Sequence, residues 1–245
     1  DPYVAPPPAR PYIQEVGADV GRLRIGVRTA AFGGLTTTHP DCVAAAEDAA
    51  RLLESLGHSV EPADLPALDD ADYTTHFITG WTAGTAWNLD HWSRLTGQEI
   101  TADDVEPLTW ALAEAGRAVT APQWLAAREW LQAHARRVQA WWTGGFDLML
   151  TPTLGEPPPP LGSFASPPEN PLHGLFRAGE FVPFTPLFNV TGQPAISLPL
   201  HWNDASLPIG VQLVAAFGAE DVLLRVAAQL EAARPWADRR PPVHA

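Results

Sequence analysis

The residues that most often carry hydrolytic chemistry are few in this chain and poorly arranged for it. Its seven serines are scattered, and none has glycine on both sides, the setting that favours a backbone oxyanion site. The single cysteine, Cys42, follows His39 in THPDC, but it falls in the first turn of a predicted amphipathic helix. A lone cysteine there is usually a small packing residue. All 15 basic residues are arginine, so a lysine base or Schiff base cannot come from these residues.

Sequence motifs for a metal or a nucleotide cofactor are also missing. His76 and His91 are too far apart to form a helical ligand pair, and there is no HExxH motif. No G-x-G-x-x-G follows a predicted strand, and no G-x-S-x-G elbow is present. The Asp-Asp pairs at 69–70 and 103–104 lie near predicted helix starts, where helix capping explains them better than acid–base catalysis. We therefore expect no cofactor and no metal.

Composition and charge restrict the class of protein further. The 245 residues, 46% hydrophobic and 18% charged, are enough to bury a core. A formal net charge of −13 would repel nucleic acid and anionic membranes, so neither is an expected partner. No apolar run approaches the roughly 18 residues of a membrane span. A lone cysteine fits a reducing compartment, and we expect a cytoplasmic protein.

Any functional site must be positioned by the predicted segments of the chain. These are a linker, a β-α-β unit, a helical region, and a region of strands with a long loop and a terminal helix. Residues 1–21 are rich in proline and are interpreted as a linker. Residues 22–68 predict a β-α-β unit, with strands at 23–28 and 58–63 around a helix that begins at Pro40 and stops at Gly57. The two strands should be parallel.

Residues 69–143 are predicted to be mostly helical, in about three pieces, and they carry eight of the ten tryptophans. In the first piece, Trp81, Thr85, Asn88 and Trp92 recur at helical spacing on one side. The last piece, at about 122–142, places Trp124, Ala127, Leu131 and His134 on one face. Core packing is the favoured interpretation of such a stripe, and a wall facing a substrate is the alternative.

Residues 144–245 are predicted to contain strands, a long loop and a terminal helix. Strands are expected at 146–150, 195–200 and 210–215, and a helix at 221–233. A Gly/Pro-rich loop at 155–180 is long enough to suggest a function. A short helix at 182–190 would follow it.

Several of these segments resemble the amidase-signature family. The stretch FDLMLTPTLGEPPPPLG at 146–162 is similar to that family's DLLLTPT…PPPLG segment. The stretch FTPLFNVTGQPAISLPLHWNDASLPIGVQLVAA at 184–216 is similar to T…N.TG.PA.S.P…LP.G.Q.V. The segments RLRIGV, PDCVAAAEDAARLLESLGHSVEPA and DVLLRVAAQLEAARPW complete the resemblance, in the family's order along almost the whole chain. The endings LPLHW and ARPWADRRPPV are most similar to bacterial members of the 6-aminohexanoate cyclic-dimer hydrolase-like group.

The resemblance implies the C-terminal portion of an amidase-signature α/β/α sandwich, with a mixed sheet flanked by helices, across residues 1–245. Members of the family hydrolyse amides with a Ser–Ser–Lys triad. One serine attacks the carbonyl, the other relays its proton, and the lysine is the base. These residues lie in the family's N-terminal half. Since this chain has no lysine and no Gly/Ser-rich signature, no catalytic residue is carried over, and we expect the chain to be inactive by itself.

Seven residues are candidates for lining a substrate pocket, because they lie at strand ends, in the loops that follow them, or on the first long helix. They are Trp81, Thr151, Thr153, Phe184, Phe188, Asn189 and Gln193. Each has a structural alternative. The two phenylalanines, spaced i and i+4, would pack in the core, Asn189 and Gly192 would end a short helix, and Thr151 would end a strand.

Three functions remain open from the sequence. The chain is part of an amidase acting on a small linear, cyclic or aryl amide, with aromatic walls favouring an apolar one. Alternatively, it is a non-catalytic remnant or binding domain, or one subunit of a split amidase. The start at Asp1-Pro2-Tyr3 suggests the interior of a longer or processed protein. The expected partners are a small amide and either the N-terminal amidase half or a second copy, because half a sheet would expose an apolar face and an unpaired edge.

Overall fold

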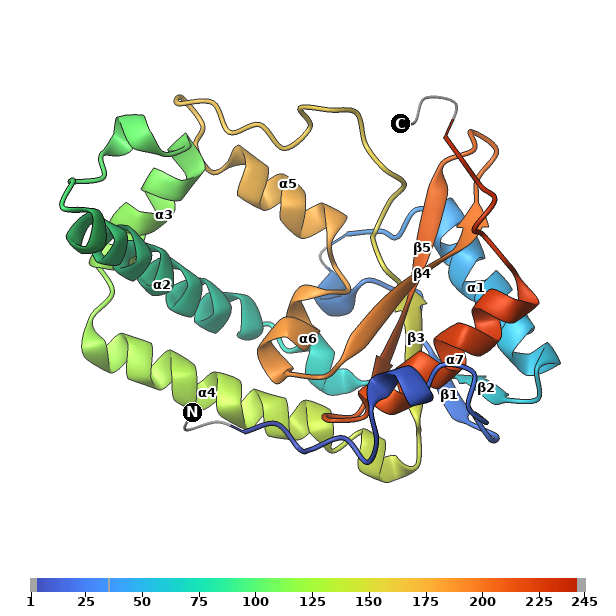
Figure 1. Cartoon of the computed structure of the whole chain (residues 1–245). Coiled ribbons are helices and arrows are strands. Elements are labelled where there is room, and N and C mark those ends of the chain that lie inside the picture. Colours follow the sequence, from blue (N-terminus) through green and yellow to red (C-terminus); the bar gives the residue numbers. More distant parts are fainter. Residues whose placement is uncertain (1–3, 35, 242–245) are drawn as a thin grey trace.

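The fold is organised around one five-stranded mixed sheet. A computed structural model describes residues 4–34 and 36–241 (Figure 1). The strands are β1 (Arg24–Val27), β2 (Ser59–Pro62), β3 (Leu148–Pro152), β4 (Ala195–Trp202) and β5 (Pro208–Ala215). Their order is β2-β1-β3-β5-β4. The pairs β1–β2 and β1–β3 are parallel, and β3–β5 and β4–β5 are antiparallel. The expected α/β class with a mixed sheet is confirmed.

The predicted β-α-β unit is present, with parallel strands. Its helix α1 (Pro40–Ser55) begins where proline fits a first turn, and the His39 ring accepts a hydrogen bond from the Asp41 N–H. It ends before Gly57, whose φ of +98° is favourable for glycine alone. Local sequence signals therefore determine both ends of this helix.

One face of the sheet is covered by α1 and by α7 (Glu220–Ala233) (Figure 1). Leu148 and Leu150 of β3 and Leu213 of β5 point into this core. The helices contribute the small and branched residues Cys42, Ala45, Ala49, Leu53, Leu223, Val226 and Leu230. Burial of these apolar side chains is the main force that holds this layer together.

The opposite face is covered near its centre by the segment around α6 (Pro186–Thr191) and by the end of α4 (Ala121–Gln139). Met149 and Val214 face this second core, which also holds Phe32, Val138, Trp142, Phe184, Leu187 and Phe188. The sheet is thus the middle of three layers, as in the expected α/β/α arrangement.

A helical arm extends from the sheet and contains α2 (Tyr73–Thr96), α3 (Pro107–Arg117) and α4 (Figure 1). The three predicted pieces are confirmed. The favoured core interpretation of the tryptophan stripe on α2 is wrong, because Trp81 and Trp92 are 43% and 54% exposed. The helix instead buries Thr82, Ala86 and Leu89, the side that packs against α3.

Two predictions for the segment between β3 and β4 require correction. The predicted loop at 155–180 ends in a helix, α5 (His173–Phe181), and the helix predicted at 182–190 is shorter, since α6 begins at Pro186. Gly174 fits α5 because a side chain there would meet the Phe164 carbonyl oxygen at 2.4 Å. The strand expected at 146–150 is present as β3, which both begins and ends two residues later, at Leu148 and Pro152.

Short 3-10 helices connect the larger elements. They are η1 (Tyr12–Gln14), η2 (Phe32–Gly34), η3 (Pro66–Asp69), η4 (Ala102–Asp104) and η5 (Trp142–Gly144). Capping is confirmed for the Asp-Asp pair at 103–104, where Asp104 accepts hydrogen bonds from the Thr101 N–H and hydroxyl. In the pair at 69–70, Asp70 accepts a hydrogen bond from the N–H of Asp72, the N-cap of α2, and Asp69 lies in the first turn of η3. Both residues also form ion pairs, Asp69 with Arg28 and Asp70 with Arg137.

Across residues 4–34 and 36–241, no helix is both long enough and apolar enough to cross a bilayer.

Candidate functional site

A buried hydrogen-bond network connects two strands to the segment before α6. Gln212 of β5 lies opposite Thr151 of β3, and its Nε2 donates to the Thr151 hydroxyl at 3.1 Å and to the Phe184 carbonyl oxygen at 3.3 Å. All three residues are buried. Because one amide donates to both acceptors, Gln212 links the polypeptide before α6 to β3. Sequence reasoning identified Thr151 and Phe184 but missed Gln212.

A second polar pair lies further along the same face of the sheet. The hydroxyls of Thr153 and Ser197 are 2.7 Å apart, and Thr153 N–H donates to the Gly210 carbonyl oxygen. A side chain at Gly210 would meet the Ser197 hydroxyl at 2.8 Å, so glycine keeps this pair accessible. Ser197 is exposed and Thr153 is partly exposed. This end of β3, β5 and β4 therefore presents hydroxyl groups on an open surface.

The two candidate phenylalanines are buried and touch the same ring. Phe184 and Phe188 pack edge-on against Phe32 at centroid distances of 5.4 and 5.9 Å. Edge-to-face contacts of this kind fix ring orientation. The structural alternative, core packing, is confirmed for both residues.

The residues that end α6 are the remaining candidates in this region. Gly192, at φ +81°, is the C-cap, which confirms the predicted helix end. Asn189 is exposed. Gln193 is 6% exposed, and its Oε1 accepts from the Thr191 hydroxyl. The Gln193 Nε2 has no partner among the described residues. A buried amide donor without an acceptor costs stability.

Trp81 lies apart from the other six candidates. Its ring packs against Phe77 of the same helix, α2, at a centroid distance of 5.4 Å. The neighbouring residue, Gly80, lines a groove of about 340 Å³ between α2, α4 and α6, together with Trp124, Leu131 and Val190. Trp81 and Asn189 thus each adjoin a residue of this mainly apolar groove, although neither lines it.

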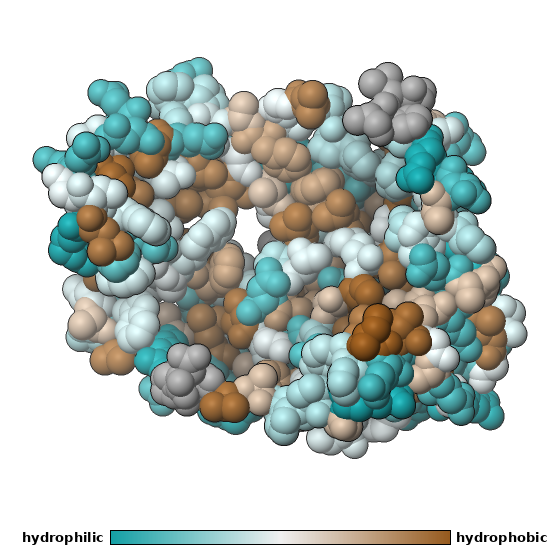
Figure 2. Space-filling view, viewed as in Figure 1, coloured by the Kyte–Doolittle hydropathy of each residue, from teal (hydrophilic) through white to brown (hydrophobic). Residues whose placement is uncertain are grey.

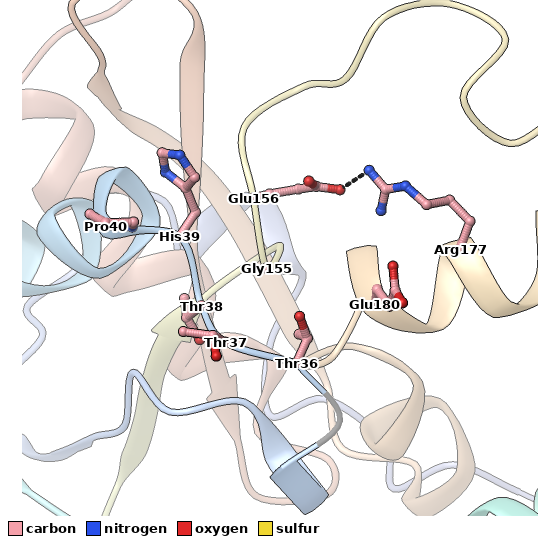
Figure 3. A pocket seen from close by; sticks show the side chains of 9 residues that line it. All are labelled: Thr36, Thr37, Thr38, His39, Pro40, Gly155, Glu156, Arg177 and Glu180. Carbon is pink, nitrogen blue, oxygen red and sulfur yellow. Dashed lines mark hydrogen bonds and ion pairs between the residues drawn. The ribbon is translucent and has the colours of Figure 1, made fainter.

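A more polar cavity of about 450 Å³ lies between α1, α5 and the loop after β3 (Figure 3). One wall is residues 36–40, and the others are Gly155, Glu156, Arg177 and Glu180. Glu156 and Arg177 form an ion pair across it. The Arg177 guanidinium also lies 5.3 Å from the Phe164 ring, which holds it in place. None of the seven candidates lines this cavity. Its residues are brought together by α5, which the sequence pattern did not reveal.

Within the part of the chain that the structure describes, the site residues can bind and orient a ligand but show no nucleophile–base pair. Five serine hydroxyls, those of Ser55, Ser93, Ser163, Ser166 and Ser197, bond to backbone groups or to Thr153 rather than to a histidine or a carboxylate. Burial raises the pKa of the Cys42 thiol to about 11, and Cys42 packs against the sheet as predicted. No cluster of three or more potential metal ligands occurs among these residues.

Known proteins match this chain along nearly its full length. The sequence model of the Amidase family matches residues 1–224. This chain belongs to the amidase family. The 6-aminohexanoate-cyclic-dimer hydrolases of Pseudomonas sp. (strain NK87) and Paenarthrobacter ureafaciens are each 39% identical to it, over 98% of this chain and 50% of theirs.

Solved structures agree with this membership. A 6-aminohexanoate cyclic dimer hydrolase complexed with substrate superposes with a TM-score of 0.92 at 39% identity, covering 98% of this chain and 51% of that one. A bacterial aryl acylamidase of the amidase-signature family superposes at 0.70 with 19% identity, which supports the fold alone. This amidase-family chain therefore spans about half the length of the curated relatives it matches.

In this amidase-family chain, sequence signals could have identified part of the polar cavity. Glu156 lies in the Pro-rich loop that was predicted to be functional, and His39 lies in the THPDC segment that was tested for a thiol site. Arg177 and Glu180 lie in the same predicted loop, at 155–180, but the sequence gave no sign that they are on a helix, α5, that packs beside Glu156.

Proposed function

We propose that this chain is the C-terminal part of an amidase that hydrolyses a C–N bond of a small amide. It would form the scaffold and one pocket wall, while the attacking serine, the bridging serine and the lysine base belong to the other half of the fold. The observation that carries this proposal is the 39% identity to 6-aminohexanoate-cyclic-dimer hydrolases over 98% of this chain but only 50% of theirs. We further propose that it works in the cytoplasm, the compartment that its lone cysteine suits.

The residues of this chain support the proposal that it forms a scaffold and pocket wall while the other half of the fold carries the catalytic residues. Amide hydrolysis needs an activated nucleophile, a base and donors for the oxyanion. Here there is no lysine, and the serine hydroxyls of the described residues have no basic partner. The structure offers instead an open surface with the hydroxyls of Thr153 and Ser197, beside a buried network that joins Thr151, Gln212 and Phe184. Such a surface can position an amide but not break it.

The substrate class follows from the groups near α6. The groove beside Val190 is mainly apolar and includes Trp124 and Leu131. The unpaired Gln193 Nε2 is a donor that an amide carbonyl oxygen can satisfy. We therefore propose a small amide with an apolar body, held by Gln193, with Trp81, Asn189, Thr151, Thr153, Phe184 and Phe188 shaping its surroundings.

The test is an assay for release of an amine from amides. This chain would be assayed alone and after co-expression with the half of the Paenarthrobacter ureafaciens hydrolase that it does not match. We expect no turnover from the chain alone and measurable turnover from the pair, first on the cyclic dimer of 6-aminohexanoate. Turnover by the isolated chain would contradict the proposed location of the catalytic residues.

A split amidase subunit and a non-catalytic remnant are the alternatives. The closed core between α1, α7 and the sheet is compatible with a separately folded subunit. Sequencing the DNA upstream of the Asp1 codon separates them. A continuous frame encoding a lysine and a Gly/Ser-rich segment supports one polypeptide, and a separate gene encoding them supports a split enzyme. If neither a continuous frame nor a separate neighbouring gene encodes the lysine and the Gly/Ser-rich segment, the non-catalytic remnant is favoured.

A further inference from the structure

The polar cavity between α1, α5 and the loop after β3 is separate from the groove proposed for the substrate. Seven of its nine lining residues have polar or charged side chains, and none of the nine lines the groove. Its character also differs from that of the opening in the middle of the molecule, where apolar residues lie along parts of the wall (Figure 2). A volume of about 450 Å³ is in the range of small-molecule sites. The cavity is therefore a candidate for a second ligand.

The walls of this cavity are joined by backbone contacts at Gly155. The Gly155 carbonyl oxygen accepts a hydrogen bond from the His39 N–H at 2.8 Å, and the Gly155 N–H donates to the Phe181 carbonyl oxygen at 2.9 Å. A side chain at Gly155 would meet the Glu180 carbonyl oxygen at 2.9 Å, so only glycine allows this close approach. The three segments that line the cavity thus meet at one residue, and the site is formed before a ligand enters it.

The charges in the cavity are unequal. The Arg177 guanidinium is ion-paired with Glu156 and is held between the rings of Phe164 and Phe181, at 5.3 and 6.0 Å. The second carboxylate, that of Glu180, is exposed and forms no hydrogen bond or ion pair with the other residues that the structure describes. One negative charge is therefore in excess, and it favours a cationic ligand over an anionic one.

The wall formed by the start of α1 does not reverse this balance. The positive end of the α1 dipole lies there, but Asp41 occupies the first turn and offsets it. The His39 Nδ1 accepts a hydrogen bond from the Asp41 N–H at 3.1 Å, and a ring nitrogen that accepts a hydrogen bond carries no proton. His39 therefore adds no positive charge while this bond is made.

The hydrogen-bonding groups left in the cavity suit an ammonium group. The hydroxyls of Thr36 and Thr37 have no partner among the described residues. Figure 3 shows the Thr36 hydroxyl and the Glu180 carboxylate on the same side of the cavity, below the ion pair of Glu156 and Arg177. An ammonium group has three N–H donors and no acceptor, so a carboxylate and hydroxyl oxygens can satisfy it. A metal ion is less suited, because one unpaired carboxylate is a poor ligand set for it.

We propose that this cavity binds the ammonium group of a short aliphatic amine, with the Glu180 carboxylate as its counter-ion and the Thr36 hydroxyl as a second acceptor. The net charge of −13 would draw such a cation toward the protein. The proposal goes beyond the proposed function, because the cavity and the substrate groove share no residue. Amide hydrolysis releases an amine, which is one source of the ligand, and only this source rests on the proposed function.

Titration of the chain with n-butylammonium tests the site, with binding followed through the backbone amide NMR signals of Gly155 and Glu180. We expect saturable binding in the millimolar range, because a partly solvated ion pair supplies little affinity. Two probes separate charge from hydrogen bonding. Butyltrimethylammonium keeps the charge without N–H donors, and butyrate reverses the charge. We expect each to bind about tenfold more weakly or worse. Equal binding of the two cations, or no saturable binding of n-butylammonium, would overturn the proposal.

Substitution of Glu180 gives a second test. We expect Glu180→Gln to weaken n-butylammonium binding by about tenfold, and to fold normally since this carboxylate has no partner among the described residues. Glu169→Gln is the matched control, because Glu169 is an exposed acid in the preceding loop that does not line the cavity. It should bind as the wild type does. An equal loss in both variants would show that affinity follows overall charge and would overturn the proposal.

The role of Thr36 is tested by a pair of variants that differ in one hydroxyl. Thr36→Val removes the proposed acceptor and keeps the shape of the side chain, whereas Thr36→Ser keeps the hydroxyl. We expect Thr36→Val to weaken n-butylammonium binding by about threefold and Thr36→Ser to retain it. Equal affinities of these two variants would overturn the assignment of Thr36.

These outcomes are separate from a failure of the proposed function, because binding is measured on the chain alone, which is expected not to hydrolyse amides. Saturable binding to the chain, without amide turnover by the complemented pair, would support the amine site and contradict the hydrolase. Turnover by the pair without saturable binding to the chain would do the reverse.

Discussion

Glu15 and Arg225 join the start of the described chain to its last helix. The Glu15 Oε2 accepts a hydrogen bond from the Arg225 Nε at 2.6 Å, and the Glu15 Oε1 accepts one from the Arg10 Nε at the same distance. The Glu15 side chain is 1% exposed. One buried carboxylate between two guanidinium groups thus ties the Pro-rich N-terminal segment to α7.

Glu15 should make stability depend on acid pH. Hydrogen bonds from Arg10 and Arg225 lower the pKa of Glu15 from 4.5 to about 2. Because the pKa is lower in the folded state, its stabilisation is present above about pH 4.5 and is lost as pH falls toward 2. We expect Glu15→Gln to lower the urea midpoint at pH 7, and this difference from the wild type to disappear near pH 2. Glu231→Gln, at an exposed position of α7, is the control and should show neither effect.

His134 should contribute a second pH dependence, near neutrality. It is fully buried, its ring stacks on Trp130 at 5.0 Å, and burial, then the charge of Arg137, lowers its pKa below 6.5. Since the unfolded chain then binds the proton more readily, stability should fall as pH drops below 6.5, by at most about 1.4 kcal/mol per pH unit. We expect His134→Phe to flatten this dependence in urea unfolding. If His134→Phe kept a pH dependence of stability as steep as that of the wild type, the assignment of this dependence to His134 would be contradicted. The variant His91→Phe is the control for loss of a histidine.

The crossing of α2 and α3 should tolerate no side chain at Gly116. A Cβ there would lie 1.9 Å from the Thr82 carbonyl oxygen. We expect Gly116→Ala to cost about 1–3 kcal/mol in the free energy of unfolding, because backbone must move to accommodate it. Gly84→Ala on α2 meets nothing within 4 Å and should instead stabilise by about 0.5–1 kcal/mol. Equal effects of the two substitutions would show that the helices do not cross this closely.

Trp81 should affect substrate binding rather than folding. It is 43% exposed beside the groove residue Gly80, so its removal costs little core packing. In the complemented enzyme, we expect Trp81→Ala to raise KM by about tenfold, with kcat nearly unchanged. Trp87→Ala, at a 58% exposed position of the same helix, is the control and should leave KM unchanged. Equal KM values for the two variants would contradict a role of Trp81 in substrate binding.

The candidate site was predictable only where a residue's role depends on nearby sequence. Gly192 ends α6 because a positive φ is needed there, and the short motif around it shows this. Gln212 and Ser197 lie on strands whose sequences predict burial and alternation, and nothing in those patterns indicates which strand they face. Their contacts with Thr151 and Thr153 join residues that are 61 and 44 positions apart.

The sequence by itself determined the local elements and the family resemblance. The helix from Pro40 to Gly57, the parallel unit around it and the absence of lysine all follow from residue types and short-range periodicity. The tertiary structure alone decided that β3 lies between β1 and β5 and that β4 is a free edge. It also decided that the tryptophans of α2 face outward and that α5 forms in a Gly/Pro-rich segment. The physical reason is that these features depend on packing between distant segments, which local propensity does not encode.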